Sequence, residues 1–255
     1  MAGEYYGGMI RASVCMATYR GAPFVREQIE SILEQLHDDD ELVIVDDASP
    51  DDTVAVIQGI DDPRVRLHAE PVNRGYVRTF ENAIRRARGK YIMLSDQDDV
   101  WTPGRLELMV AHLDTHLVVA GNYSVLGENG RMPARRPLRP GYDRKFGWNT
   151  LAILVGYRPY FGCAMGFRRE LVRDLVPFPE IFIESHDLWL AILGNATRSI
   201  SHLSEVVVER RLHDYNVTPL KWRPLGTILT ARLMLARGML IARRRVRLRP
   251  PTSIV

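Results

Sequence analysis

Cysteine is scarce in this 255-residue chain, which contains only Cys15 and Cys163. Both lie among apolar residues without CxxC spacing, so we expect buried thiols in a reducing compartment and no disulfide framework. Long apolar runs are also missing, because no segment approaches the ~18 to 20 residues that a membrane span needs. The N-terminal MAGEYYGGMI has no basic segment followed by an apolar core. We therefore expect no signal peptide and a cytoplasmic location.

Acidic residues are absent after Asp214, where the chain has nine basic ones: Lys221, Arg223, Arg232, Arg237, Arg243, Arg244, Arg245, Arg247 and Arg249. Positions 1–214 carry a formal charge of −6, although the whole chain carries +3. The high isoelectric point thus describes the tail and not the body. Because no aromatic residues alternate with these arginines, we expect no nucleic-acid partner.

The first half of the chain alternates strand and helix patterns. Strands are predicted at 12–17, 41–45, 65–68 and 90–94, with helices at 23–36, 51–59 and 76–88 between them. This order predicts an α/β fold whose mostly parallel sheet has right-handed crossovers and helices on both faces. After residue 115 the pattern weakens. It predicts strands at 116–125 and 160–167, a loop at 127–141 and the start of a helix at 184–191.

Three carboxylates follow the fourth predicted strand directly: Asp96, Asp98 and Asp99, with Gln97 between the first two. Thr102 is expected to cap a helix that opens with Pro103. Acids at the end of a buried strand repel one another, and a divalent cation such as Mg²⁺ or Mn²⁺ would neutralise them. The alternative is an acidic loop whose carboxylates cap neighbouring helices.

The other predicted strands also end in turn-forming or acidic residues. These are Thr18 to Gly21 after the first strand, Asp46 and Asp47 after the second, and Asn73 to Gly75 after the third. Ligands of parallel sheets bind beyond the carboxyl ends of the strands. We therefore expect these segments to form one site with the acidic loop.

These segments resemble family 2 glycosyltransferases of the GT-A fold. The resemblance rests on VCMATYRG (14–21), VIVDDASPDDT (43–53), NRGYVRTFENAIRRARGKYIMLSDQDDVW (73–101), FGCAMGFRREL (161–171) and SHDLWLA (185–191). It implies one domain over 10–220, with a nucleotide-sugar and metal-binding half at 10–115 and an acceptor half at 116–220. A basic helical tail at 221–255 would follow. Within the family, the chain is similar to bacterial polysaccharide transferases, many of them described as rhamnosyltransferases.

The resemblance implies roles on the donor side. Thr18 and Tyr19 would line the nucleotide pocket, and Asp47, with Asp46 in reserve, would accept a hydrogen bond from the imide of uracil or thymine. Asn73 and Gly75 would approach the diphosphate. Asp96 would contact ribose or metal, and Asp98 would be the chief ligand of Mn²⁺ or Mg²⁺. Asp99 is as well explained by a supporting contact or a helix cap, and the alternative for Asp46 and Asp47 is helix capping through the SPDDT turn.

On the acceptor side, the family pattern places the catalytic base at Asp187. Inverting transfer needs such a carboxylate beside the acceptor hydroxyl. Glu184 is the reserve, His186 could orient its neighbour, and a structural first-turn acid is the alternative for Asp187. Arg211 and His213 match a segment that would close over the diphosphate. This chain departs from that pattern at Asp214 and Tyr215, which leaves the contacts of this lid open.

The tail allows two interpretations. Residues 225–241 are apolar and helix-prone, and 243–249 are mostly arginine. They could form an anchor on anionic lipid, which would suit a lipid-linked saccharide acceptor. A helix packed on the catalytic domain is equally consistent, because Arg232 and Arg243 interrupt the apolar arc.

The sequence thus predicts metal-dependent, inverting transfer of a sugar from a UDP- or dTDP-sugar to a saccharide hydroxyl. An inactive nucleotide-sugar sensor is an alternative, and Asp187 argues against it. A nucleotidylyltransferase is another, but it typically has a glycine-rich, lysine-bearing loop after the first strand, and this chain has Thr18 to Gly21 there. The donor sugar is not indicated by the sequence.

Overall fold

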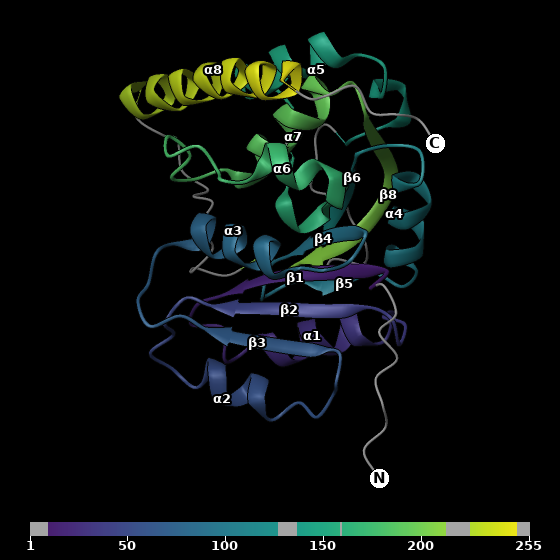
Figure 1. The fold of residues 1–255 in the computed structure, drawn as a ribbon, viewed down its shortest axis with the longest axis vertical. Coiled ribbons are helices and arrows are strands. Elements are labelled where there is room, and N and C mark those ends of the chain that lie inside the picture. The colour runs from purple at the N-terminus through teal and green to yellow at the C-terminus, as the bar shows by residue number, and fades with distance from the viewer. Residues whose placement is uncertain (1–9, 127–136, 159, 213–224, 249–255) are drawn as a thin grey trace.

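The computed structural model describes residues 10–126, 137–158, 160–212 and 225–248, and it confirms the α/β prediction. One eight-stranded sheet has the order β3-β2-β1-β4-β7-β6-β8-β5 (Figure 1). Its first four strands run parallel: β1 (Ala12–Thr18), β2 (Glu41–Asp46), β3 (Val65–Ala69) and β4 (Tyr91–Ser95). The helices α1 (Val25–Leu33), α2 (Thr53–Gln58) and α3 (Tyr76–Arg86) connect them.

The second half of the sheet is mixed. Strand β7 (Met165–Arg168) pairs antiparallel with β4 and with β6 (Val118–Val125). Strand β8 (Ile200–Arg210) runs parallel to β6, and the short β5 (Val100–Trp101) pairs antiparallel with β8 at the edge. The helix α5 (Phe146–Leu154) and strand β8 were not predicted.

The strand predicted at 160–167 was correct only at its end. A 3₁₀ turn spans Gly162–Ala164, and β7 begins at Met165. The small residues do mark close approaches, as expected from their positions. A Cβ on Gly162 would lie 2.7 Å from the His186 Nε2, and one on Gly166 would lie 2.4 Å from the Met93 sulfur.

The predicted cap of the fourth helix was wrong. Helix α4 (Arg105–Leu113) starts two residues after Pro103, with Gly104 at its N-cap in a left-handed conformation (φ +74°). The Thr102 hydroxyl instead donates to the Val206 carbonyl (3.0 Å). Because β5 pairs with β8, Thr102 lies next to Val206, and its hydrogen bond stabilises this edge of the sheet.

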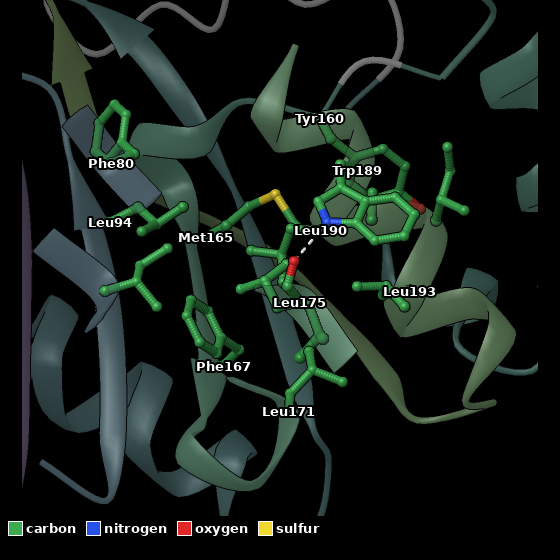
Figure 2. Close-up of a cluster of buried hydrophobic side chains, with 14 of the residues drawn as sticks. Phe80, Leu94, Tyr160, Met165, Phe167, Leu171, Leu175, Trp189, Leu190 and Leu193 are labelled. Atoms are coloured by element: carbon green, nitrogen blue, oxygen red, sulfur yellow. Dashed lines mark hydrogen bonds between the residues drawn. The ribbon is translucent and has the colours of Figure 1, made fainter. Parts of the chain in front are cut away.

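Apolar cores lie on both faces of the sheet. One joins α1 and α4 through residues such as Ile29 and Met109. The other packs α3, α6 (Val172–Leu175) and α7 (His186–Ala196) against β4 and β7. Figure 2 shows its centre, where the buried Trp189 indole donates to the Leu175 carbonyl (3.0 Å). This core fixes the start of α7 above the sheet.

The tail forms helix α8 (Leu225–Arg247), which packs on the domain. Leu235 and Ala242 are buried, and Gly238 lies against the Phe182 ring. The Arg245 guanidinium donates to the carbonyls of Asp174 (2.6 Å) and Pro177 (2.8 Å). One face of the tail therefore agrees with the packed-helix interpretation. No described helix has both the length and the apolar character needed to cross a bilayer.

Candidate active site

The loops after β1 and β4 are joined by Gln97. Its side-chain amide accepts from the Tyr19 backbone N–H (2.8 Å) and donates to the Tyr19 carbonyl (2.9 Å). Gly21 permits this pairing, because a Cβ there would lie 2.3 Å from the Gln97 Oε1. The acidic loop and the Thr18–Gly21 turn therefore lie side by side, as their places at the strand ends predicted.

Asp46 is a structural residue of the turn after β2. It is buried and accepts hydrogen bonds from the Thr18 hydroxyl (2.9 Å), the Ser49 hydroxyl (2.6 Å) and the Ser49 N–H (2.8 Å). These contacts engage both carboxylate oxygens in the turn.

Asp47 holds the loop that precedes α3. Its two carboxylate oxygens accept from the backbone N–H groups of Arg74 (2.7 Å) and Gly75 (2.8 Å), and Asn73 donates to its carbonyl (3.1 Å). Gly75 is the N-cap of α3 with φ +83°, a conformation that favours glycine. The contacts that the structure gives the Asp47 carboxylate are not helix caps of the SPDDT segment. Each oxygen retains a second lone pair.

The acidic loop after β4 concentrates negative charge in a poorly solvated place. Burial and the neighbouring Asp98 raise the pKa of Asp96 to about 6. Burial and the charges of Asp96 and Asp98 raise the pKa of Asp99 to about 8. One Asp99 oxygen accepts from the Arg211 N–H (3.2 Å), while the other is buried without a partner among the described residues.

This donor set fits a hard divalent cation. Ligand atoms of Asp96, Asp99 and Cys163 lie within 4.8 Å of one another, so this cluster contains the predicted ligand Asp96 and the reserve Asp99 but not Asp98, the predicted chief ligand. Burial and the two carboxylates raise the pKa of the Cys163 thiol well above its usual value, so the sulfur stays protonated. Carboxylate oxygens, and not this thiol, would bind Mg²⁺ or Mn²⁺. A cation would also relieve the repulsion that raises the two carboxyl pKa values.

Together with Arg105 of α4, Arg210 at the end of β8 places positive charge near this loop. Its guanidinium lies 5.0 Å from the ring centres of both Tyr123 and Phe161. Burial opposes its charge, but Cys163, Asp99 and Asp96 raise its pKa above the usual value. The sequence analysis missed Arg210, because β8 was not predicted and the residue is one of many arginines.

Asp187 lies in the first turn of α7, and its carboxyl interacts with the charge of Asp96 in the same loop. Burial and, more weakly, the charge of Asp96 raise the pKa of the Asp187 carboxyl to about 7, although the hydrogen bond from the Leu188 N–H (2.7 Å) opposes the shift. Glu184 lies half-buried in the preceding turn. The two predicted halves of the site, the acidic loop and the base, are therefore close enough for their charges to interact.

Tyr76 connects α3 to this turn. Its hydroxyl accepts from the backbone N–H of Ser185 (3.1 Å), a residue in a left-handed conformation (φ 64°) just before α7. Burial raises the Tyr76 pKa to about 12, and the charges of Asp187, Glu184 and Asp96 contribute. Sequence reasoning did not identify Tyr76, which therefore adds to the predicted site.

His186 does not orient Asp187 through a hydrogen bond in this structure. Its ring stacks on Phe80 (centroids 4.3 Å apart) and meets the edge of Tyr76 (5.6 Å). Neither ring nitrogen has a partner in the described part of the chain, and burial lowers its pKa to about 3. The neutral imidazole, on the first residue of α7, packs against the aromatic side chains of α3.

Comparison with known proteins identifies the family. The sequence model of the family named glycosyl transferase family 2 matches residues 13–176. The chain belongs to this family. Its membership favours transfer of a glycosyl group over transfer of a nucleotidylyl group.

Several relatives of this glycosyltransferase are bacterial proteins. It is 24% identical over 218 residues to the Escherichia coli UDP-Glc:alpha-D-GlcNAc-diphosphoundecaprenol beta-1,3-glucosyltransferase WfgD, covering 84% of this chain and 81% of WfgD. It spans 48% and 34% of the lengths of two other bacterial relatives that it matches.

Solved structures share the glycosyltransferase fold. Staphylococcus aureus TarS (residues 1–349) in complex with UDP-GlcNAc has a TM-score of 0.69 at 18% identity, over 92% of this chain and 70% of that one. The mannosyltransferase PcManGT from Pyrobaculum calidifontis, in complex with GDP-Man and Mn²⁺, has a TM-score of 0.60 at 20% identity, over 92% and 73%. At these identities the likeness shows the fold alone.

The predicted lid of this glycosyltransferase is described only in part. The Arg211 guanidinium donates to the Asp98 carbonyl (3.2 Å) and to Glu27 on α1 (2.6 Å), so it braces the acidic loop. His213 lies outside the described residues, as do Asp214 and Tyr215.

A cavity of about 340 Å³ lies beside the donor half of the glycosyltransferase. Asp47 and Arg74 line it together with the α3 residues Arg78, Asn82 and Arg85. Neither the acidic loop nor Asp187 lines it, so this hollow is separate from the place where the acids meet.

Proposed function

We propose that the protein is an inverting glycosyltransferase. It would transfer a sugar from a UDP- or dTDP-sugar to a saccharide hydroxyl, in the synthesis of a bacterial surface polysaccharide or glycoconjugate. The observation that carries this proposal is the position of Asp187 in the first turn of α7, where burial, with a smaller contribution from the charge of Asp96 on the acidic loop, raises the pKa of its carboxyl. A base facing the diphosphate end of a donor is the arrangement that single displacement requires.

The donor half would bind the nucleotide. Thr18 and Tyr19 line the pocket, and a free lone pair of Asp47 accepts the uracil or thymine imide N–H. The loop of Asn73 and Gly75, held by Asp47, would place the N-terminus of α3 near the diphosphate.

Asp98 and Asp96 would hold Mn²⁺ or Mg²⁺, with Asp99 in reserve. When bound, the metal neutralises charge that builds on the departing nucleoside diphosphate. Arg210 adds a fixed positive charge at the same loop. Arg211 also holds the loop in place, through its contact with Glu27.

Asp187 would remove the acceptor proton. As the acceptor oxygen bonds to the anomeric carbon, the bond from that carbon to the diphosphate oxygen breaks on the opposite face. The hydroxyl proton moves to the Asp187 carboxylate, and no covalent intermediate with the enzyme forms. Tyr76 and the Ser185 turn hold the base in position.

The acceptor would be a saccharide or a lipid-linked saccharide, as the name of WfgD suggests for that relative. Two buried free thiols support a reducing, cytoplasmic location. A lipid-linked acceptor would bring the enzyme to the inner face of the cytoplasmic membrane.

A donor screen tests the function. UDP-glucose, UDP-GlcNAc, dTDP-rhamnose and GDP-mannose are incubated with the protein, with Mn²⁺ or with EDTA, and release of the nucleoside diphosphate is measured. We expect metal-dependent release from a uridine or thymidine donor. It should be abolished in Asp98→Ala and retained in Asp61→Asn, an exposed acid on another loop. Donor binding by calorimetry without turnover of any donor would instead favour the sensor.

A further inference from the structure

Exposed apolar side chains gather at one end of the molecule. Among the described residues, twelve large apolar side chains are exposed, and eight belong to α5, α8 or the residues that directly follow them. They are Trp148, Leu151, Val155, Tyr157, Leu229, Leu233, Leu240 and Leu248. Gathering of this kind marks an interaction surface, whereas isolated exposed apolar residues are ordinary.

The two helices form one end of the fold. Helices α5 and α8 are neighbours at the top of Figure 1, and the β3 edge of the sheet is at the opposite end. At the end of α5, a Cβ on Gly156 would lie 2.3 Å from the guanidinium of Arg232 on α8. The exposed residues of both helices therefore belong to the same end of the protein.

Each helix presents a stripe. On α5, Trp148, Leu151 and Val155 recur at intervals of three and four residues and are 54%, 49% and 59% exposed. On α8, the exposed stripe consists of Leu229, Leu233, Arg237, Leu240 and Arg244. The opposite stripe of α8, with Leu235 and Ala242, is the face buried on the domain.

The charged residues of α8 are all basic. Arg237, Arg243, Arg244 and Arg247 on α8 are exposed, as are Arg144 and Lys145 just before α5. Neither helix contains an acidic residue. Leucine and tryptophan surrounded by arginine match the interface of an anionic bilayer, where apolar groups enter the acyl boundary and guanidinium groups bind headgroup phosphates.

We propose that α5 and α8 together form a surface that binds bilayers containing anionic lipid. The protein would lie on the membrane without crossing it, with Trp148, Leu151 and Val155 on one helix and Leu229, Leu233 and Leu240 on the other at the lipid boundary. This surface combines the tail helix α8 with a second helix, α5, from the middle of the chain. It does not depend on the donor chemistry proposed above.

Vesicle flotation tests the proposal with the full chain and no donor. We expect binding to vesicles with about one phosphatidylglycerol in three lipids, weak binding to phosphatidylcholine alone, and loss at high salt. Arg243→Glu/Arg244→Glu should weaken binding at least about 25-fold, because each arginine near an anionic surface contributes about 5-fold. Leu151→Ser/Val155→Ser should also weaken it. The matched controls, Arg26→Glu and Val72→Ser, change exposed residues elsewhere and should not.

Trp148 offers a direct readout. Among the tryptophans that the structure describes, Trp148 is 54% exposed, whereas Trp101 and Trp189 are buried, so in a Trp222→Phe background insertion should shift the emission of the exposed indole to the blue. Trp148→Phe should remove the shift. No binding to anionic vesicles, or binding that none of the α5 and α8 substitutions weakens, would overturn the proposal. So would light scattering showing a dimer that the same substitutions dissociate. Calorimetry with UDP separates a failure here from a failure of the proposed function, because donor binding should be unchanged in these variants.

Discussion

At the scale of single residues, the site is defined by carboxyl groups whose charged form is energetically unfavourable. Asp96, Asp99 and Asp187 have raised pKa values because burial and mutual repulsion disfavour their charged forms. Asp46, in contrast, has its oxygens engaged in its own turn. Perturbed carboxyls that converge from separate elements are typical of active sites. The arrangement favours chemistry at Asp187 and cation binding at the loop.

Asp187 predicts a pH dependence of transfer. A base must be deprotonated, and the Asp187 pKa is about 7, so kcat/KM should fall tenfold per pH unit below about 7. The measurement is kcat/KM for the preferred donor across neutral and acidic pH at saturating metal. A profile that stays flat down to the ordinary range of an aspartate would contradict this assignment.

Asp187→Asn should separate activity from stability. Transfer should fall about 10²- to 10⁴-fold because the base is lost. The folded pKa of about 7 lies above the ordinary 3.8, so the wild-type carboxyl costs stability that increases as pH rises from 4 toward 7. At pH 8 the variant should therefore be more stable, by on the order of 1 kcal/mol. Urea denaturation at pH 8 and at pH 4 measures the difference, which should vanish at the lower pH.

At the scale of elements, close backbone approaches set where the strands lie. Gly89 precedes β4 and lies against β1, where a Cβ would come within 2.5 Å of the Ala12 carbonyl carbon and the Ser13 nitrogen. Main-chain atoms in a sheet cannot move aside as a flexible side chain can. This glycine therefore keeps β4, and with it the acidic loop, next to β1.

Gly89→Ala should destabilise the fold. The clash is with backbone, so we expect a loss of at least about 1–3 kcal/mol in the free energy of unfolding, the usual cost of overpacking. Gly147→Ala is the matched control, because nothing lies within 4 Å of its Cβ position and alanine favours the α5 helix. Equal urea midpoints for the two variants would show that β1 and β4 can move apart without a measurable loss in the free energy of unfolding.

At the scale of the whole molecule, the two halves of the sheet meet at the site. Strands β1, β2 and β4 bring the donor loops, while β8 and α7 bring Arg210 and Asp187. A ligand that bridges them should stabilise the native state as a unit, because it binds the folded form only.

UDP and Mn²⁺ together should raise the melting temperature. At about 100 times the dissociation constant, the stabilisation should be about 2.7 kcal/mol. In Asp98→Ala the share that depends on Mn²⁺ should be lost, while Asp61→Asn should respond like the wild type. Differential scanning calorimetry with and without EDTA measures it. An unchanged metal response in Asp98→Ala would remove that residue from the ligand set.

The sequence determined the parallel half of the fold by itself. Local patterns sufficed there: apolar strands that end in turn or acidic residues, each followed by an amphipathic helix, in the order that parallel sheets require. The same patterns placed Thr18, Asp47, Asp96 and Asp98 at the strand ends. The family resemblance, and no local pattern, identified Asp187.

Only the tertiary structure decided the rest. Strand β8 pairs with β6 and β5, which are distant in sequence. This pairing places Arg210 at the acidic loop. It also brings the Thr102 hydroxyl to the Val206 carbonyl, so that Thr102 does not cap the helix as predicted. Tyr76 gained a role because α3 packs beside the start of α7. The tail helix has one buried and one exposed face, because neighbouring elements cover only one side of it. Side-chain periodicity encodes which face of an element is buried, but contacts between distant elements depend on packing that no single segment contains.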